Sequence, residues 1–358
     1  MLAFFVSFLI VVLGMPSLIR LAFQKNLLDD PEEDRKVHKR SVPRLGGVLI
    51  FIGTIVTTTL LVQPEGGAAI AFLRIAAAST ILFFLGLKDD LAELDPLKKL
   101  LAQIAVGIIL VVGGGFEIQS FGGLFGVHTL PSFVSIPFSL FVYIVVVNAV
   151  NLIDGIDTLA GGYGLLATLS CALWFQFTDQ PDFFILCLAM AGALSGFILF
   201  NISPARIFMG DSGSLVLGMF IYVMATSIMA TPAELVPPAW SQKNLPLLAM
   251  TTLSYPLVDT LRVFTLRVLD GRSPFSPDRN HLHHKILRFG FSHLQTAFII
   301  HTYTAIMVAI GFLMPTGSST LAFFILLGVA FMLPVLLFSA EKVQLILRTM
   351  RRKKASAH

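Results

Sequence analysis

The sequence predicts an all-α, polytopic membrane protein. Three observations support this fold class: an apolar composition, apolar runs of membrane length, and a one-sided placement of basic residues. Of 358 residues, 56% are hydrophobic, 13% are charged and 32 are Phe. A soluble domain is about half apolar and about a quarter charged. The shortage of charge therefore indicates that lipid is the solvent for much of the surface.

Membrane-length apolar runs recur along the whole chain. A spanning helix needs about 20 mostly apolar residues, and membrane helices tolerate internal Gly and Pro. Because the first run lacks a basic start and a small-residue cleavage site, we expect it to be retained as a span. We expect one integral-membrane domain over residues 1–340 and a basic tail over 341–358. Eleven runs are present, at about 1–22, 46–63, 69–87, 97–114, 132–150, 157–177, 183–200, 212–230, 245–266, 297–314 and 320–340.

The basic residues predict the orientation of these spans. Lys and Arg concentrate on the cytoplasmic side of membrane proteins. With the N-terminus outside, all 25 Lys and Arg residues except Arg74 and Lys243 fall in cytoplasmic segments or helix ends. The sequence therefore predicts about eleven transmembrane helices, an N-terminus outside and a cytoplasmic C-terminus.

Carboxylates gather at the cytoplasmic ends of these predicted spans. Polar groups near the membrane are tolerated where they line a protein-enclosed or wet cavity. We therefore expect an active site at the cytoplasmic face. Five carboxylates from three separate regions of the sequence define this face: Asp89, Asp90, Asp154, Asp157 and Asp211.

The stretch "NAVNLIDGIDTLAGG" places four polar residues at every third position after an apolar run. Each three-residue step on an α-helix falls short of a full turn by about 60°. Asn148 and Asn151 would share one face, while Asp154 and Asp157 swing progressively round it. Gly155 favours a bent or re-entrant start to the next span. The alternative is that the amides only form hydrogen bonds between helices.

Two further acidic motifs suit phosphate chemistry. Asp89 and Asp90 in "GLKDDLAELDP" would bind Mg²⁺, which takes one or two carboxylates plus substrate phosphates; the alternative is a solvated acidic pair. In "NISPARIFMGDSGSLVLG", Asp211 precedes an apolar run and is either a site residue or a simple helix cap. Arg206 suits a phosphate, and Phe208 offers a flat face for a base.

Cationic groups lie in the predicted cytoplasmic loops around these carboxylates. The triplet of His281, His283 and His284 in "DGRSPFSPDRNHLHHKILRFG" would bind a diphosphate. Zinc and a basic face on anionic lipid are the alternatives for this loop. Arg44 at a span entrance and Lys99 at the start of the fourth run are further candidates. Carboxylates for a metal and cations for phosphates together indicate phosphoryl transfer between a soluble nucleotide and a lipid.

Four motifs at these residues resemble one family, the polyprenyl-phosphate N-acetylhexosamine-1-phosphate transferases of the glycosyltransferase 4 type. Their order and their placement at cytoplasmic ends agree, so the resemblance covers essentially residues 1–340. "HLHHKI" is similar to the N-acetylglucosamine-using branch, whereas muramoyl-pentapeptide phosphotransferases have a contiguous HHH followed by Phe-Glu. The motifs are "KVHKRSVPRLGG", "GLKDDLAEL", "NAVNLIDGIDTLAGG" with "NISPARIFMGDSGSL", and "NHLHHKILRFG".

The resemblance implies a reaction, its cofactor and its setting. UDP-N-acetylglucosamine and undecaprenyl phosphate would give undecaprenyl-diphospho-N-acetylglucosamine and UMP, the first membrane step of a cell-envelope glycan. The cofactor would be Mg²⁺, with Mn²⁺ as a substitute, and the protein would be multi-pass in the bacterial inner membrane. We expect contact with the lipid bilayer and no nucleic-acid partner, and a homodimer is compatible with the resemblance.

The resemblance also implies residue roles. Asp211 and Asp154 would bind the metal. The catalytic carboxylates would be Asp89, Asp90, Asp154 and Asp157, with Asp89 or Asp90 as the base or as the residue that orients the attacking phosphate. Phe208 would stack on uracil. The substrate-binding residues would be Arg44, His38, Lys99, Asn148, Asn151, Asn201, Arg206, Phe208, His281, His283 and His284.

Other interpretations stay open at this point. The donor could be another UDP-N-acetylhexosamine or UDP-MurNAc-pentapeptide, and attack could be direct or pass through an aspartyl-phosphate. A cation- or proton-coupled transporter is the alternative of another class, but it should show repeated halves and charges near the midplane, and we find no internal repeat. Asp259, three residues before Arg262, is interpreted as half of a structural ion pair.

Overall fold

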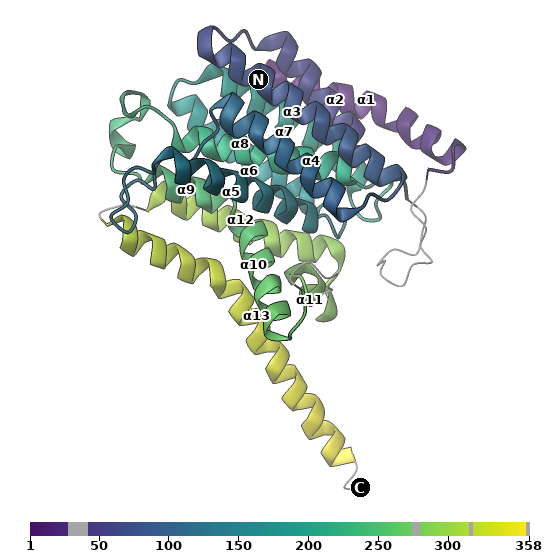
Figure 1. Ribbon diagram of the computed structural model, residues 1–358. Coiled ribbons are helices and arrows are strands. Elements are labelled where there is room, and N and C mark those ends of the chain that lie inside the picture. Colours follow the sequence, from purple (N-terminus) through teal and green to yellow (C-terminus); the bar gives the residue numbers. More distant parts are fainter. Residues whose placement is uncertain (28–41, 274–279, 315–317, 356–358) are drawn as a thin grey trace.

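The computed structural model describes residues 1–27, 42–273, 280–314 and 318–355, with side chains as far as residue 340 (Figure 1). This part of the chain contains thirteen α-helices and no β-strand, which confirms the all-α prediction. Their bounds are α1 Leu2–Gln24, α2 Gly46–Leu61, α3 Gly66–Leu91, α4 Pro96–Ile108, α5 Ser132–Leu152, α6 Leu159–Phe177, α7 Pro181–Asn201, α8 Asp211–Met229, α9 Leu245–Thr252, α10 Ser254–Leu269, α11 Leu282–Arg288, α12 His293–Leu313 and α13 Ser319–Ala355.

Eight of the described helices are long and apolar enough to cross a membrane: α1, α3, α4 with its π-helical extension to Gly113, α5, α7, α8, α12 and the first part of α13. The chain is therefore a multi-pass membrane protein. The predicted runs at 46–63 and 157–177 form α2 and α6, which are helical but do not belong to these eight. The predicted run at 245–266 is divided at Leu253 into α9 and α10.

Helix α8 forms the centre of the bundle. Every residue from Ser212 to Ile228 is buried, which is the pattern of a helix that packs on all sides. Helices α2, α3, α5, α6 and α9 pack against it. Because α8 is enclosed in this way, its first residue, Asp211, is held at a fixed position among the ends of its neighbours.

Helices α10 and α11 lie beside α13 at the edge of the main bundle (Figure 1). α11 also packs against the start of α12, where Ser292 and Gln295 form a capping box. Helix α11, which carries His283 and His284, is thus supported by α12 and α13.

Candidate active site

The first turn of α8 is approached closely by two other helices. A Cβ atom on Gly86 of α3 would lie 2.4 Å from the Asp211 carbonyl carbon and oxygen. A Cβ atom on Gly47 of α2 would lie 2.1 Å from the Gly213 nitrogen. Because glycine has no Cβ, backbones can meet at these two points. The close contacts bring the motifs of α2, α3 and α8 into one site.

Asp90 of α3 caps the N-terminus of α8. Its Oδ1 accepts a hydrogen bond from the Asp211 N–H at 2.7 Å, and its Oδ2 accepts one from the Ser212 N–H at 3.0 Å. These are two of the N–H groups that a helix start leaves without a partner. Gly210, at φ +71°, is the N-cap residue, and α8 has no cap from its own side chains. The interpretation of Asp211 as a simple helix cap is therefore wrong.

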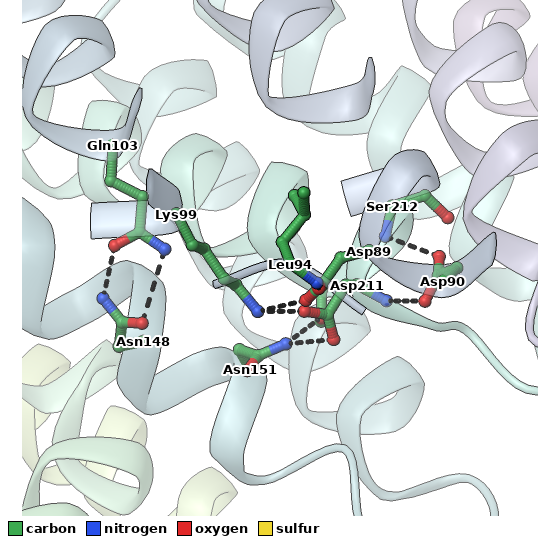
Figure 2. Close-up of polar contacts among 10 residues, drawn as sticks. Asp89, Asp90, Leu94, Lys99, Gln103, Asn148, Asn151, Asp211 and Ser212 are labelled. Atoms are coloured by element: carbon green, nitrogen blue, oxygen red, sulfur yellow. Dashed lines mark hydrogen bonds and ion pairs between the residues drawn. The ribbon is translucent and has the colours of Figure 1, made fainter. Parts of the chain in front are cut away.

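The carboxylate of Asp211 is turned instead toward Lys99 and Asn151 (Figure 2). Lys99 Nζ of α4 contacts Asp211 Oδ2 and donates to Asp89 Oδ2 at 2.9 Å. Asn151 Nδ2 of α5 donates to Asp211 Oδ1 and to Ser214 Oγ, each at 2.8 Å. The side chains of Asp89, Lys99 and Asp211 are 17%, 18% and 26% exposed. Four helices thus supply a partly open cluster of two carboxylates, one ammonium and one amide.

Asp154 lies in the turn between α5 and α6 and faces the same helix start. Its carboxylate accepts a hydrogen bond from the Gly210 N–H. Burial raises the pKa of Asp154 to about 7, and the negative charges of Asp211 and Asp90 act in the same direction. Asp154 therefore lies next to the Asp211 cluster.

Asp157, in the same turn, makes different contacts. It is 2% exposed, accepts a hydrogen bond from the Ala205 N–H at 3.3 Å, and lies 3.4 Å from His293 Nδ1 of α12. Its neighbour Thr158 has φ +65° and donates its N–H to Asn201 Oδ1 at 2.7 Å. Asp157 and Asn201 therefore join the turn after α5 to the loop that precedes α8.

Two of the predicted substrate-binding amides bond to protein groups. Asn201 Nδ2 donates to the Ile207 carbonyl at 2.8 Å. Asn148 Nδ2 donates to Gln103 Oε1 at 2.7 Å, and Gln103 donates back at 3.4 Å (Figure 2). Asn148 and Asn151 both lie on α5, but only Asn151 donates to Asp211. Gln103 was not identified from the sequence, since a lone Gln in an apolar run gives no signal.

The entrance of α2 lies alongside the loop before α8. The Phe208 N–H donates to the Pro43 carbonyl at 2.8 Å, and the Gly46 N–H donates to the Phe208 carbonyl at 2.9 Å. These bonds bring Arg44 next to Gly210, whose Cβ would lie 2.3 Å from the Arg44 carbonyl oxygen. Arg44 and Phe208 therefore lie near Asp90. Arg206 is exposed and packs its guanidinium 4.7 Å from the Phe200 ring centre.

Of the three histidines, His283 packs against the turn after α5. A Cβ on Gly155 would lie 2.5 Å from His283 Nε2. His283 is 1% exposed, and neither ring nitrogen has a hydrogen-bond partner among the described residues. Burial lowers the pKa of His283 to about 3, so the ring is neutral. Its ring centre lies 5.6 Å from that of His281 and 4.2 Å from that of His284. His38 lies outside the described residues.

The donor set around Asp211 fits a hard divalent cation. Among the described residues, no three His, Cys, Asp or Glu side chains converge in a metal-binding arrangement. Mg²⁺, however, is usually held by one or two carboxylates together with substrate phosphates. The carboxylate oxygens of Asp211 and Asp154 meet that requirement, whereas the histidines are separated from them by the Gly155 turn.

The arrangement is that of a membrane enzyme for phosphate esters, and comparison with known proteins identifies its family. The chain is 31% identical over 307 residues to the undecaprenyl-phosphate alpha-N-acetylglucosaminyl 1-phosphate transferase of Escherichia coli, with 82% of this chain and 78% of that protein covered. It is 31% identical over 334 residues to the decaprenyl-phosphate N-acetylglucosaminephosphotransferase of Mycobacterium tuberculosis, covering 85% and 81%. The family model for glycosyl transferase family 4 matches residues 72–229. The chain belongs to this family, as its motifs predicted.

Proposed function

We propose that the protein transfers N-acetylglucosamine 1-phosphate from UDP-N-acetylglucosamine to undecaprenyl phosphate, with release of UMP. The observation that carries this proposal is the cluster of Asp89, Lys99, Asn151 and Asp211, which brings two carboxylates, one ammonium and one amide from four helices to one helix start. The names of the relatives support the same donor sugar and a polyprenyl phosphate acceptor. The product would open the synthesis of a cell-envelope glycan.

The proposed topology has eleven spans, with the N-terminus outside and the active site at the cytoplasmic face of a bacterial inner membrane. The distribution of Lys and Arg supports this orientation. The spans would form one transferase domain over residues 1–340, followed by the basic tail over 341–358. UDP-N-acetylglucosamine would then enter from the cytoplasm, and undecaprenyl phosphate would enter from the bilayer.

The reaction needs positioned charge more than a strong base. An oxygen of undecaprenyl phosphate attacks the donor phosphorus that carries the sugar, and the bond from that phosphorus to UMP breaks. The acceptor phosphate is largely ionised at neutral pH, because its second pKa is about 6. Lys99 and Arg44 would neutralise the phosphate charge that spreads in the transition state. Asn151 would hold Asp211 in place.

The carboxylates divide into supporting and reacting groups. Both oxygens of Asp90 accept backbone hydrogen bonds, so its role would be to fix the start of α8. Asp89 faces Lys99 and would orient the attacking phosphate or accept its last proton. Asp211 and Asp154 would hold Mg²⁺, or Mn²⁺ in its place, and the bound ion would supply further charge neutralisation. His281, His283 and His284 would contact the donor diphosphate, and Phe208 would stack on its uracil.

UMP release by the purified protein in detergent tests this proposal. The assay contains undecaprenyl phosphate and either UDP-N-acetylglucosamine, another UDP-N-acetylhexosamine or UDP-MurNAc-pentapeptide. We expect release that requires lipid and divalent metal, is fastest with UDP-N-acetylglucosamine, and is lost in Asp211→Asn. Asp270→Asn is the control, since that exposed residue follows the end of α10 and pairs with Arg272. Folded protein that releases no UMP from any of these donors would refute the proposal.

A further inference from the structure

Asp259 of α10 is a fully buried carboxylate with three donors around it. Oδ2 lies 2.9 Å from His281 Nδ1, and Oδ1 accepts the Leu282 N–H at 2.8 Å. Arg262 Nη2 donates to Oδ1 at 3.1 Å, which confirms the ion pair expected from the sequence. Asp259 itself is 0% exposed. Burying a charged carboxylate is costly unless it is paired and hydrogen-bonded. The three contacts together therefore compensate for the burial of the Asp259 charge.

The contacts join α10 to the first residues of the histidine loop. Arg262 Nη2 also donates to the Asn280 carbonyl. Three consecutive residues, Asn280, His281 and Leu282, are therefore tied to the Asp259–Arg262 pair. An ion pair that only stabilised α10 would need neither the ring of His281 nor the backbone of Leu282. The observed geometry instead fixes where α11 begins and which way the His281 ring faces.

The contact with Asp259 also determines how His281 can bind a ligand. A carboxylate accepts hydrogen bonds and does not donate them, so Nδ1 of His281 carries the hydrogen in this contact. The second ring nitrogen, Nε2, lies on the far side of the ring from Asp259. When the ring is protonated both nitrogens carry hydrogen, and Nε2 can then donate to a phosphate oxygen. A carboxylate that engages one nitrogen sets the orientation of the other, as it does for histidines that bind metals.

A line of ring contacts leads from His281 to the active-site turn. The rings of His281 and His283 are nearly parallel, 13° apart. His283 is packed against Gly155, which adjoins Asp154. A displacement of the His281 ring would therefore shift the His283 ring and the turn that carries Asp154.

We propose that Asp259 is a positioning residue for the donor: it holds His281 so that Nε2 faces the diphosphate of the sugar nucleotide. This inference rests on the proposed function, in which the histidines contact that diphosphate. Asp259 touches no reacting atom and acts through His281 alone. Its loss should therefore weaken binding of the donor and leave binding of the lipid acceptor unchanged.

Steady-state kinetics of Asp259→Asn test this assignment. Asn keeps the size and can still accept from Leu282, but its amide nitrogen cannot accept the hydrogen on His281 Nδ1. We expect the KM for UDP-N-acetylglucosamine to rise on the order of tenfold, the loss typical of one hydrogen bond to a charged group. The KM for undecaprenyl phosphate should stay at the wild-type value. Asp270→Asn, at the exposed end of the same helix, should change neither constant.

A double-variant cycle separates positioning from general damage to the fold. If Asp259 acts through His281, Asp259→Asn should add no further rise in donor KM to His281→Gln. An equal rise in both backgrounds would overturn the inference and leave the role of the histidines intact. If His281→Gln alone leaves donor KM unchanged, the proposed histidine role fails and the inference fails with it.

A second variant covers the case in which Asp259→Asn does not fold, because it leaves Arg262 without its charged partner. Asp259→Glu keeps the charge but moves the carboxylate by one methylene group. With its unfolding midpoint in detergent near that of wild type, this variant should show the same selective rise in donor KM. Equal rises in the KM for donor and lipid would contradict a positioning role for Asp259.

Discussion

Gly86→Ala tests whether the close approach of α3 to α8 creates the active site. The new Cβ would lie 2.4 Å from the Asp211 carbonyl carbon and oxygen and 2.5 Å from the Ser212 nitrogen. Carbon atoms pack at about 3.5 Å or more. Since all three neighbours are backbone atoms, no side chain can rotate away. The start of α8 must therefore retreat from α3 by about 1 Å.

This displacement acts directly on the hydrogen bonds of Asp90. They are 2.7 Å and 3.0 Å long, and an added 1 Å or so takes both beyond hydrogen-bond distance. Asp211, the first residue of α8, would move with the helix. A misplacement of about 1 Å at a reacting centre costs about a hundredfold in rate. We therefore expect kcat/KM to fall about a hundredfold.

The assay is steady-state UMP release, with Gly67→Ala as the matched control. Gly67 lies in the first turn of the same helix, and a Cβ there would meet nothing within 4 Å. The control should keep wild-type kcat/KM, and both variants should retain their helical circular dichroism. A folded Gly86→Ala protein with wild-type kcat/KM would refute the claim that this contact positions Asp211.

Three further predictions concern single side chains. Lys99→Met removes the cation between Asp89 and Asp211 and should lower the rate of UMP release about a hundredfold in steady-state assays. A rate within the error of wild type would contradict the role of Lys99. Gln103→Leu, which removes the partner of Asn148, should lower the unfolding midpoint and leave the rate unchanged; a slower rate would connect Asn148 to the substrate. Because burial holds the pKa of His283 near 3, below its usual 6.5, the unfolded state binds the extra proton as pH falls below 6.5. Stability should therefore decline from pH 6.5 toward pH 3, by up to about 1.4 kcal/mol per pH unit, and His283→Asn should flatten this slope in thermal unfolding; an unchanged slope would contradict the neutral buried ring.

The helices could be predicted because they depend on local patterns. Each of the eleven apolar runs contains helix in the described chain. The break between α9 and α10 was not foreseen, since residues 245–266 read as one apolar run. The backbone turns at Leu253, three residues before Pro256, and the apolar pattern continues through the turn. Hydropathy records burial in lipid or protein, and it does not record the direction of the backbone.

The sequence predicted which residues form the site more fully than it predicted the contacts between them. Motif residues from α3, α4, α5 and α8 do meet, as Asp89, Lys99, Asn151 and Asp211 show. That Asp90 caps a helix 121 residues away could not be read from the sequence. Contacts of this kind depend on the packing of whole helices.

Local spacing did not identify partners that lie far away in the sequence. Asn148 and Asn151 were predicted to share a helix face, but the bond of Asn148 to Gln103 of α4 was not predicted. Asp259 was interpreted through its neighbour Arg262 alone. The partner His281 is 22 residues further along the chain and across a loop, so no periodicity connects the two.

The most direct test of the account follows the two phosphorus atoms of the donor. UDP-N-acetylglucosamine is labelled with ³²P on either the uridine-side or the sugar-side phosphorus and incubated with the protein and undecaprenyl phosphate. The account predicts that the sugar-side label enters the lipid extract together with N-acetylglucosamine, while the uridine-side label stays in water as UMP. Sugar in the lipid extract with both labels left in water as UDP would contradict transfer of the sugar 1-phosphate.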